Sequence, residues 1–269
     1  MANEIIYGRH PVIEALKAGT RNFKKILVAK TFEGDIVKKI ISLAREKKIP
    51  VEFVGREKLI CYAKNHQGIV AYVSPKEYLQ YEKLIHSLKD KKNALICVLD
   101  EVEDPQNLGV ILRSAACFGV DGIIIQKKAS ANISPGTAKA SAGAIEYVPI
   151  VRVSNISQAI DGLKEQGFWI YGAEMSGGEA WKTEIKGRIA LIIGNESSGL
   201  RHLTKQKCDF LLRIPIHNNI SSLNAAISAS IIFYEINRQR HCEKKSAVSS
   251  VSLENLNHAR ELLFLQDRL

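Results

Sequence analysis

The chain has 269 residues, of which 46% are hydrophobic, and carries a formal net charge of +10. This length suits two domains of ordinary size, and the hydrophobic content is sufficient for a buried core. No uncharged apolar run approaches the roughly 18 residues of a membrane span, and the first residues lack a signal-peptide pattern. These features exclude a membrane-spanning protein, and we predict a cytoplasmic one.

The residues 1–75 alternate between helical and strand patterns. Helices are predicted at 10–19, 34–48 and 56–65, and strands at 24–29, 51–54 and 68–73. This alternation indicates a small α/β domain. The segment holds 14 basic and 7 acidic residues, an excess that suits a polyanion-binding module. A merely soluble basic surface would give the same charge, so charge alone does not decide between the two.

Residues 76–93 are charged and short of branched apolar residues, which predicts a partly helical linker to a second domain at 94–241. That domain contains uninterrupted apolar runs separated by helical patterns. Such runs are typical of a parallel sheet covered on both faces, with ligands bound beyond the carboxyl ends of its strands. The strands are predicted at 94–100, 122–126, 168–174, 188–194 and 209–216.

The five cysteines are odd in number, widely spaced and without a CxxC pair. We predict reduced core thiols, since no pairing or zinc-ligand pattern is present. The histidines also lack ligand spacing, so no metal site is predicted. Residues 242–269 form a tail with a possible helix, for which the sequence predicts no function.

The first helical pattern of the second domain, residues 104–120, contains a single arginine. Leu108, Ile111 and Leu112 follow the spacing of one core-facing side. Arg113 points about 140° away from Leu108 and lies among small or apolar neighbours. The helix is therefore predicted to be covered nearly all round, and a permanent cation at this place needs an explanation.

Two loops follow predicted strands and carry polar residues. In the segment 100–109, Asn107 fits a helix cap, which is the simpler interpretation of that residue taken alone. In the segment 194–200, GNESSGL, Glu196 has no evident structural task, although a plain turn explains the segment equally well. The glycines of this segment would let a ligand approach the backbone.

A third loop, within residues 214–228, leads from the last predicted strand into a helix that starts with small residues. Ser221 or Ser222 is predicted to cap this helix. Capping by a serine leaves Asn224 without an explanation. The chain has no GxGxxG after its first strand, no phosphate-loop lysine, no HExxH and no GxSxG, which disfavours the corresponding chemistries.

In this order and spacing, the three loops resemble the signature motifs of the SpoU family of RNA 2'-O-ribose methyltransferases, within the SPOUT superfamily. DPQNLGVILRSA matches the first motif, GNESSGL the second and IPIHNNISSLNAAIS the third. YGRHPVIEAL and NHQGIVA also resemble the family's N-terminal substrate-binding domain. The likeness is greatest to members that methylate a guanosine of large-subunit ribosomal RNA.

The resemblance implies an α/β fold: a SPOUT trefoil-knot catalytic domain with a mostly parallel sheet, plus a small N-terminal α/β domain of ribosomal-protein-like fold. General topology rules alone would reject a knot. It further implies S-adenosyl-L-methionine as cofactor, RNA as substrate, and a homodimer in which the first-motif arginine helps complete a site with the neighbouring chain. Neither a membrane nor a metal is an expected partner.

The resemblance also assigns site residues. The expected catalytic set is Asn107, Arg113, Glu196, Ser222 and Asn224. The expected cofactor-binding set is Ala173, Ile193, Gly194, Ile214, Leu223 and Ala225. The chain departs from the family after Pro215, where Ile216 and residues 217–219 replace a common Met and Gly.

Two alternatives remain at this point. The first is ribose methylation of transfer RNA by the same chemistry. The second is an inactive RNA-binding factor of ribosome assembly, which the retention of all five polar motif residues disfavours. S-adenosylmethionine binding would separate an enzyme from a pure RNA binder.

Overall fold

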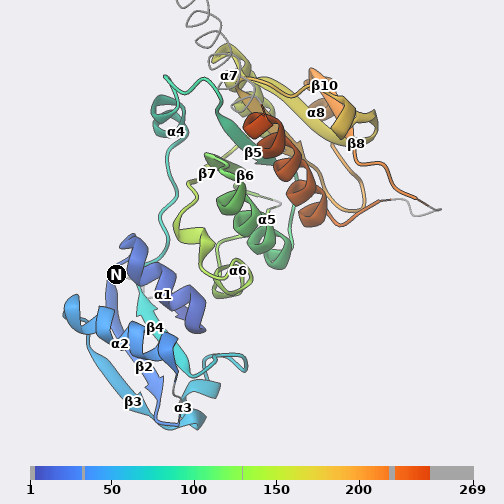
Figure 1. The fold of residues 1–269 in the computed structure, drawn as a ribbon. Helices are drawn as coiled ribbons and strands as arrows, with labels where there is room; N and C mark the ends of the chain where they lie inside the picture. Colours follow the sequence, from blue (N-terminus) through green and yellow to red (C-terminus); the bar gives the residue numbers. More distant parts are fainter. Residues whose placement is uncertain (1–3, 32–33, 129, 218–221, 243–269) are drawn as a thin grey trace, which may run out of the picture.

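The computed structural model describes residues 4–31, 34–128, 130–217 and 222–242. Two β-sheets lie in separate parts of the molecule (Figure 1). The smaller sheet has four strands in the order β1-β4-β2-β3, and the larger has six in the order β10-β8-β9-β5-β6-β7. The predicted α/β class is confirmed, whereas the predicted domain boundaries and the trefoil knot stay predictions.

The smaller sheet contains every strand predicted before residue 75 and one more. The additional strand, β1, is four residues long and lies at the edge of the sheet. The helix predicted at 56–65 ends at Ile60, because the chain turns back through Gln67 and Gly68, both with positive φ. The elements are β1 Glu4–Tyr7, α1 Arg9–Ala18, β2 Phe23–Ala29, α2 Asp35–Glu46, β3 Val51–Val54, α3 Arg56–Ile60 and β4 Ile69–Val73.

The linker segment contains α4, Tyr81–Ser87, and leads into the larger sheet, whose strand pairs are all parallel within the described residues. The five predicted strands are present, and β7 is additional. The elements are β5 Leu95–Leu99, α5 Pro105–Phe118, β6 Gly122–Gln126, α6 Pro135–Ala140, η1 Ala144–Glu146, β7 Ile150–Val153, α7 Ile156–Glu165, β8 Trp169–Glu179, η2 Ala180–Lys182, β9 Ile189–Ile193, α8 His202–Gln206, β10 Phe210–Arg213 and a helix over 225–242.

Both faces of the larger sheet are covered. On one face, α5 and the helix 225–242 bury side chains such as Leu108, Ile111 and Phe233 against the strands. On the other face, α7 contributes Ile156 and Ile160 to a second cluster. Strands β5 and β9 are buried along their whole length, which explains their unbroken apolar sequences.

The strand order determines where a site can form. Strand β5 lies between β6 and β9, and Leu99 at the end of β5 pairs with Ile193 at the end of β9. From β5 the chain builds outward through β6 and β7, and it later returns to the other side of β5. The loops after β5 and β9 therefore meet at a point where connections diverge, the usual position of ligand sites in such sheets.

A buried ionic cluster connects the part of the chain around the smaller sheet to η1, which lies beside the larger sheet. Arg21, which follows α1, pairs through Nε with Oε1 of Glu146 at 2.8 Å and through Nη1 with Oε2 of Glu4 at 2.7 Å. Thr20 also donates its hydroxyl to Glu146. The Arg21 side chain is fully buried. Removing one member would leave a buried charge without its partner, so this junction is expected to resist separation.

The cysteines correct one prediction. Cys97 is buried in β5 and Cys208 is half-buried, but Cys61, Cys117 and Cys242 are exposed. The prediction of core thiols is therefore wrong for three of the five. The reason is that an apolar run on a helix also includes outward-facing positions, as for Cys117 on α5.

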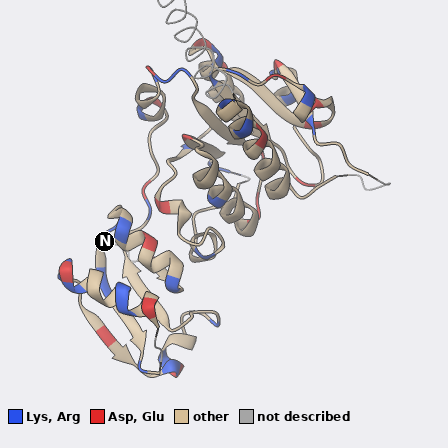
Figure 2. Ribbon diagram, in the orientation of Figure 1, with Lys and Arg blue, Asp and Glu red and all other residues tan. Residues whose placement is uncertain are grey.

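Surface charge and hydropathy add two observations. Lys and Arg residues are spread over several elements of the smaller domain rather than gathered on one (Figure 2). In the described ranges, every helix is too short or too polar to cross a membrane. The basic residues of the segment 1–75 are thus carried by several elements.

Candidate functional site

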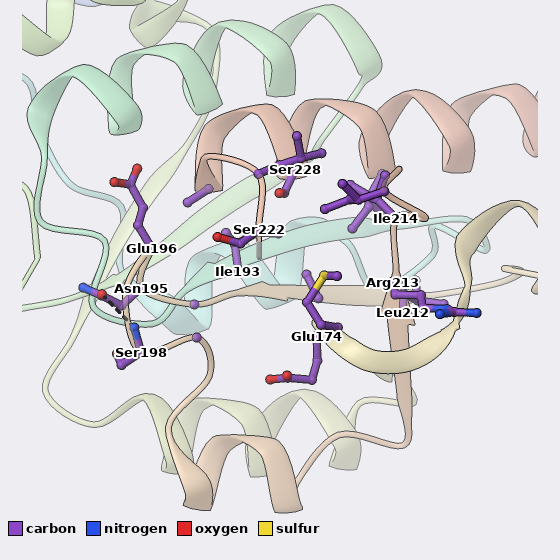
Figure 3. A pocket seen from close by; sticks show the side chains of 18 of the residues that line it. Glu174, Ile193, Asn195, Glu196, Ser198, Leu212, Arg213, Ile214, Ser222 and Ser228 are labelled. Atoms are coloured by element: carbon purple, nitrogen blue, oxygen red, sulfur yellow. Dashed lines mark hydrogen bonds between the residues drawn. The ribbon is translucent and has the colours of Figure 1, made fainter. Parts of the chain in front are cut away.

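A cavity of about 440 Å³ lies between the middle of β8 and the carboxyl ends of β9 and β10, beneath the start of the helix 225–242 (Figure 3). In Figure 3, Glu196 lies toward one end of this cavity and Arg213 toward the other. All six residues expected from the resemblance to bind the cofactor line it: Ala173, Ile193, Gly194, Ile214, Leu223 and Ala225. Two members of the expected catalytic set, Glu196 and Ser222, line it as well.

Several lining residues were not predicted. Glu174 is the last residue of the predicted strand 168–174, and Met175 lies in the part of β8 that continues beyond it. Ser228 and Ile232 line the cavity from the helix 225–242. They follow Ala225 at spacings of three and seven residues, so a helical-face analysis started at Ala225 would have found them.

The segment 194–200 is a tight turn, as the simpler interpretation predicts. Asn195 and Gly199 exchange two backbone hydrogen bonds of 3.0 and 2.9 Å. A Cβ atom on Gly194 would lie 2.4 Å from the carbonyl carbon and oxygen of Gly199. Only glycine fits at position 194, because a side chain there would collide with the backbone that closes the turn.

Glu196 projects from this turn and binds two asparagine side chains. Asn224 donates from Nδ2 to Glu196 Oε1 at 2.7 Å, and Asn107 donates from Nδ2 to the same oxygen. Asn224 Nδ2 also lies 3.0 Å from Asn107 Oδ1. A residue of α5, a residue of the turn 194–200 and the residue that precedes the helix 225–242 thus form one hydrogen-bonded cluster at the edge of the cavity. This cluster is the structural task of Glu196 that the sequence left unexplained.

The structure overturns the interpretation of Asn107 as a cap. Asp104 caps α5 instead, because its side-chain Oδ1 accepts a hydrogen bond of 3.0 Å from the backbone N–H of Gln106. Asn107 is the third residue of the helix and is buried. Its amide is therefore available for Glu196.

The predicted serine cap of the last helix is also wrong. Asn224 is the capping residue, since its Oδ1 accepts hydrogen bonds from the backbone N–H groups of Ala226 and Ile227, at 2.9 and 3.2 Å. Ser222 is exposed and lines the cavity, and Ser221 lies outside the described residues. Asn224 thus uses its oxygen for the helix and its NH₂ group for Glu196.

Arg113 does not meet the other four expected catalytic residues within one chain. Its side chain is exposed, does not line the cavity, and makes no hydrogen bond or ion pair with any residue the structure describes. Val110 and Cys117, on the same side of α5, are exposed too. The predicted all-round covering of this helix is therefore wrong for the single chain.

The exposed side of α5 continues onto the helix 225–242. The two helices are joined by a 2.6 Å contact between the Ser114 and Ser230 hydroxyls and by the rings of Phe118 and Tyr234, 5.9 Å apart. Large apolar side chains stand exposed along this double-helix face, among them Tyr234 at 54%. We define the face by Val110, Arg113, Cys117, Ile227, Ile231 and Tyr234.

Among the described residues that line the cavity there is no histidine or cysteine, and Cys208 lies outside this lining. In the described ranges, no three His, Cys, Asp or Glu side chains are close enough together to hold a metal ion. Burial raises the pKa of the Cys208 thiol to about 12, so this side chain stays protonated and is a poor nucleophile. The arrangement offers hydrogen bonds and shape, which suits positioning rather than covalent catalysis.

Comparison with protein families gives two matches. The model described as SpoU rRNA Methylase family matches residues 94–234. The model described as RNA 2'-O ribose methyltransferase substrate binding matches residues 5–79. A Staphylococcus aureus (strain COL) protein, named as a TrmH-family tRNA/rRNA methyltransferase, is 40% identical over 244 residues, which cover 90% of this chain and 98% of that protein.

Solved structures resemble the whole two-sheet arrangement. The SpoU methyltransferase AviRb of Streptomyces viridochromogenes, crystallised with AdoMet, has a TM-score of 0.74 at 24% identity, covering 89% of this chain and 91% of that one. An AdoMet-bound rRNA methyltransferase of Sinorhizobium meliloti has a TM-score of 0.72 at 25% identity, with coverages of 88% and 87%. These matches confirm the family resemblance seen in the three loops, and the chain belongs to the SpoU family of RNA methyltransferases.

Proposed function

We propose that the protein transfers a methyl group from S-adenosylmethionine to the ribose 2'-oxygen of a guanosine in large-subunit ribosomal RNA. The observation that carries this proposal is the cavity itself. All six residues expected to bind the cofactor line it, and the Glu196–Asn107–Asn224 cluster stands at its edge. Since RNA and S-adenosylmethionine both occur in the cytoplasm, we place the reaction there.

The cavity fits S-adenosylmethionine in size and chemistry. Its volume of about 440 Å³ lies within the roughly 300–1,000 Å³ of small-molecule sites. Ile193, Ile214 and Leu223 offer apolar surface for an adenine ring, and the backbone around Gly194 offers hydrogen bonds. The carboxylates of Glu174 and Glu196 suit a ligand that carries positive charges. When bound, this cofactor supplies a methyl group activated by a sulfonium.

Arg113 has a role in this reaction if it orients the RNA. Its planar guanidinium can hold the phosphate beside the target ribose with two hydrogen bonds, which sets the 2'-hydroxyl in line for displacement. A guanidinium is very hard to deprotonate, so it is a poor general base. We therefore assign the hydroxyl proton to a phosphate oxygen or a water molecule, and to Arg113 the task of orienting and polarising.

The site becomes complete in a homodimer. The double-helix face exposes several large apolar side chains, including Ile227 at 49% and Tyr234 at 54%, which is typical of a surface that is covered in an assembly. Arg113 lies on this face, six residues and about 9 Å along α5 from Asn107. A two-fold contact through the face would bring the partner's Arg113 toward the Glu196 cluster, and this is the arrangement we propose.

Transfer RNA is the second candidate substrate, because the Staphylococcus aureus relative is named for both RNA classes. Mass-spectrometric mapping of ribose methylation in a strain lacking the gene distinguishes the two. We expect one 2'-O-methylguanosine to disappear from large-subunit ribosomal RNA. Loss of a 2'-O-methylated nucleotide from a transfer RNA instead would identify transfer RNA as the substrate. Unchanged methylation of all RNA, together with no heat on titration with S-adenosylmethionine, would favour the inactive RNA-binding factor.

A further inference from the structure

Asp100 and Arg201 form an ion pair at the carboxyl end of β5, next to the turn that carries Glu196. Asp100 follows β5, and its side chain is completely buried. Arg201 is the first residue after the turn 194–200. The backbone N–H of Asp100 donates to the carbonyl of Ile193, the last residue of β9, at 2.8 Å. The two strand ends from which the site loops emerge are therefore already joined at this point.

Arg201 grips the segment after β5 with both its backbone and its side chain. Its N–H donates to Asp100 Oδ2 at 3.2 Å, and its Nε and Nη2 lie 2.7 and 2.5 Å from Asp100 Oδ1. Nη1 lies 3.3 Å from a carboxylate oxygen of Glu101, and Nη2 donates to Gln126 Oε1 at 3.3 Å. One guanidinium thus connects the end of the turn 194–200 to the ends of β5 and β6.

The start of the same turn is connected to the same segment. Asn195 donates from Nδ2 to the backbone carbonyl of Glu101 at 2.9 Å. Its Oδ1 accepts hydrogen bonds from the N–H groups of Ser197 and Ser198, which shapes the turn. Glu101 has a φ of +63°, an uncommon conformation for a non-glycine residue. The turn is therefore held at both ends by residues 100–101, on either side of Glu196.

We infer that Arg201 is a positioning residue that holds the turn 194–200 so that Glu196 receives the amides of Asn107 and Asn224 beside the bound cofactor. This inference rests on the proposed function. Asn107 is rigidly placed by α5, whereas Glu196 projects from a loop, so the loop needs a separate support to reach Asn107. The planar fork of an arginine spans Asp100, Glu101 and Gln126 together, which a lysine cannot do.

A purely structural ion pair would predict a different outcome from a positioning one. The variants Arg201→Met and Arg201→Lys are compared with Lys164→Met as a matched control. Lys164 is similarly exposed and also pairs with a carboxylate, that of Asp209 at 2.6 Å, but it lies on α7, across the sheet from the helix 225–242. Melting temperature, S-adenosylmethionine affinity by calorimetry, turnover, and RNA affinity by filter binding are measured for each.

For Arg201→Met we expect S-adenosylmethionine binding to weaken by about tenfold or more, since the turn that lines the cavity loses its support. Turnover falls with it, while RNA affinity stays within about twofold of the parent protein. Arg201→Lys should recover part of the loss, and Lys164→Met should leave cofactor affinity and turnover unchanged. A lower melting temperature with unchanged cofactor affinity and turnover would overturn the inference.

A double-mutant cycle tests whether Arg201 acts through Glu196. The effect of Arg201→Met on S-adenosylmethionine affinity and on turnover is measured in the parent protein and again in the Glu196→Gln variant. If Arg201 serves to position the Glu196 carboxylate, its removal costs clearly less in the Glu196→Gln background. Full additivity of the two losses would show that the two side chains act independently and would contradict the inference.

Amide hydrogen exchange gives a readout that does not depend on the enzyme's activity. In Arg201→Met, the amides of Ser197 and Ser198 should exchange about tenfold faster or more, while that of Leu191 in β9 should not change. Unaltered exchange at both serines would overturn the positioning role. Failure of the parent protein to bind S-adenosylmethionine would instead remove the proposed function and leave the exchange result to be judged by itself.

Discussion

The Glu196 cluster and the double-helix face differ in how complete they are within one chain. Glu196, Asn107 and Asn224 satisfy one another through hydrogen bonds, and the loops that carry them are tied together from behind. Arg113 stands exposed among apolar side chains and has no partner among the described residues. The first region is formed within one chain. We propose that the second is completed by a partner chain that covers it.

This difference separates two contributions to one reaction. The described lining of the pocket in one chain includes all six residues expected to bind the cofactor, so we expect each chain to hold the cofactor through these residues. The guanidinium that we assign to the RNA phosphate belongs to the face through which we propose that two chains associate. Cofactor binding and turnover should therefore respond differently to changes in the two regions, and the predictions below use that separation.

The largest effect is expected from Arg113→Ala. Turnover should fall by about three orders of magnitude, because the charge and geometry that align the ribose are lost. S-adenosylmethionine affinity should stay unchanged, since Arg113 does not line the cavity. Single-turnover kinetics and calorimetry measure the two quantities. A fully active variant would remove Arg113 from the mechanism.

Gly194→Ala should act on the other region. The added Cβ would lie 2.4 Å from the backbone of Gly199, so the turn must move. We expect cofactor affinity to fall by about a hundredfold, a loss close to 3 kcal/mol. Gly136→Ala serves as the control, because its Cβ would meet no atom closer than 3.4 Å. Equal cofactor affinities in both variants would contradict the assigned role of the turn.

Ile231→Asp tests the double-helix face. A carboxylate in the middle of an apolar contact is costly to bury, so the dimer should dissociate and turnover should drop by about tenfold or more. Light scattering after size exclusion gives the mass, and calorimetry should show retained cofactor binding. Leu203→Asp, at an exposed position on α8 outside this face, is the control. A dimeric, active Ile231→Asp protein would place the interface elsewhere.

The smallest effect is expected from removing residues 1–75. RNA affinity should weaken by about tenfold and become less sensitive to salt, because phosphate contacts of the basic domain are lost. Cofactor binding should remain. Lys76, which remains in the truncated protein, lies 3.7 Å from the Glu146 carboxylate, so Glu146 keeps a cationic neighbour after Arg21 is removed. Filter binding at several salt concentrations measures both affinity and slope. An unchanged slope would count against RNA contacts by this domain.

The sequence predicted most of the sheets because buried strands leave unbroken apolar runs. Strands β1 and β7, which were missed, have four residues each and lie at an edge of their sheets. Length and position do not explain the difference by themselves, because β3 is an edge strand of the same length and was predicted.

The sequence predicted which residues belong to the site, but not which hydrogen bonds they make. The motif resemblance named the residues, yet local cap rules assigned the caps to Asn107 and a serine instead of Asp104 and Asn224. Several small polar residues stand near each helix start, and which one caps depends on where the helix begins. The exposure of Arg113 was missed for another reason: a helical pattern shows that a face is apolar, but not which molecule covers it.

Subunit complementation tests most directly whether Arg113 acts on the pocket of the partner. Arg113→Ala and Gly194→Ala chains are produced together with two different affinity tags, and the mixed dimers are isolated by successive use of both. Turnover is measured at an S-adenosylmethionine concentration that saturates the parent site but leaves the Gly194→Ala site largely empty, so that each variant alone has little activity. If the arginine acts across the interface, each mixed dimer holds one intact site of two and recovers about half of the parent turnover. If mixed dimers form but stay as inactive as their parents, Arg113 does not serve the neighbouring pocket and the account is wrong.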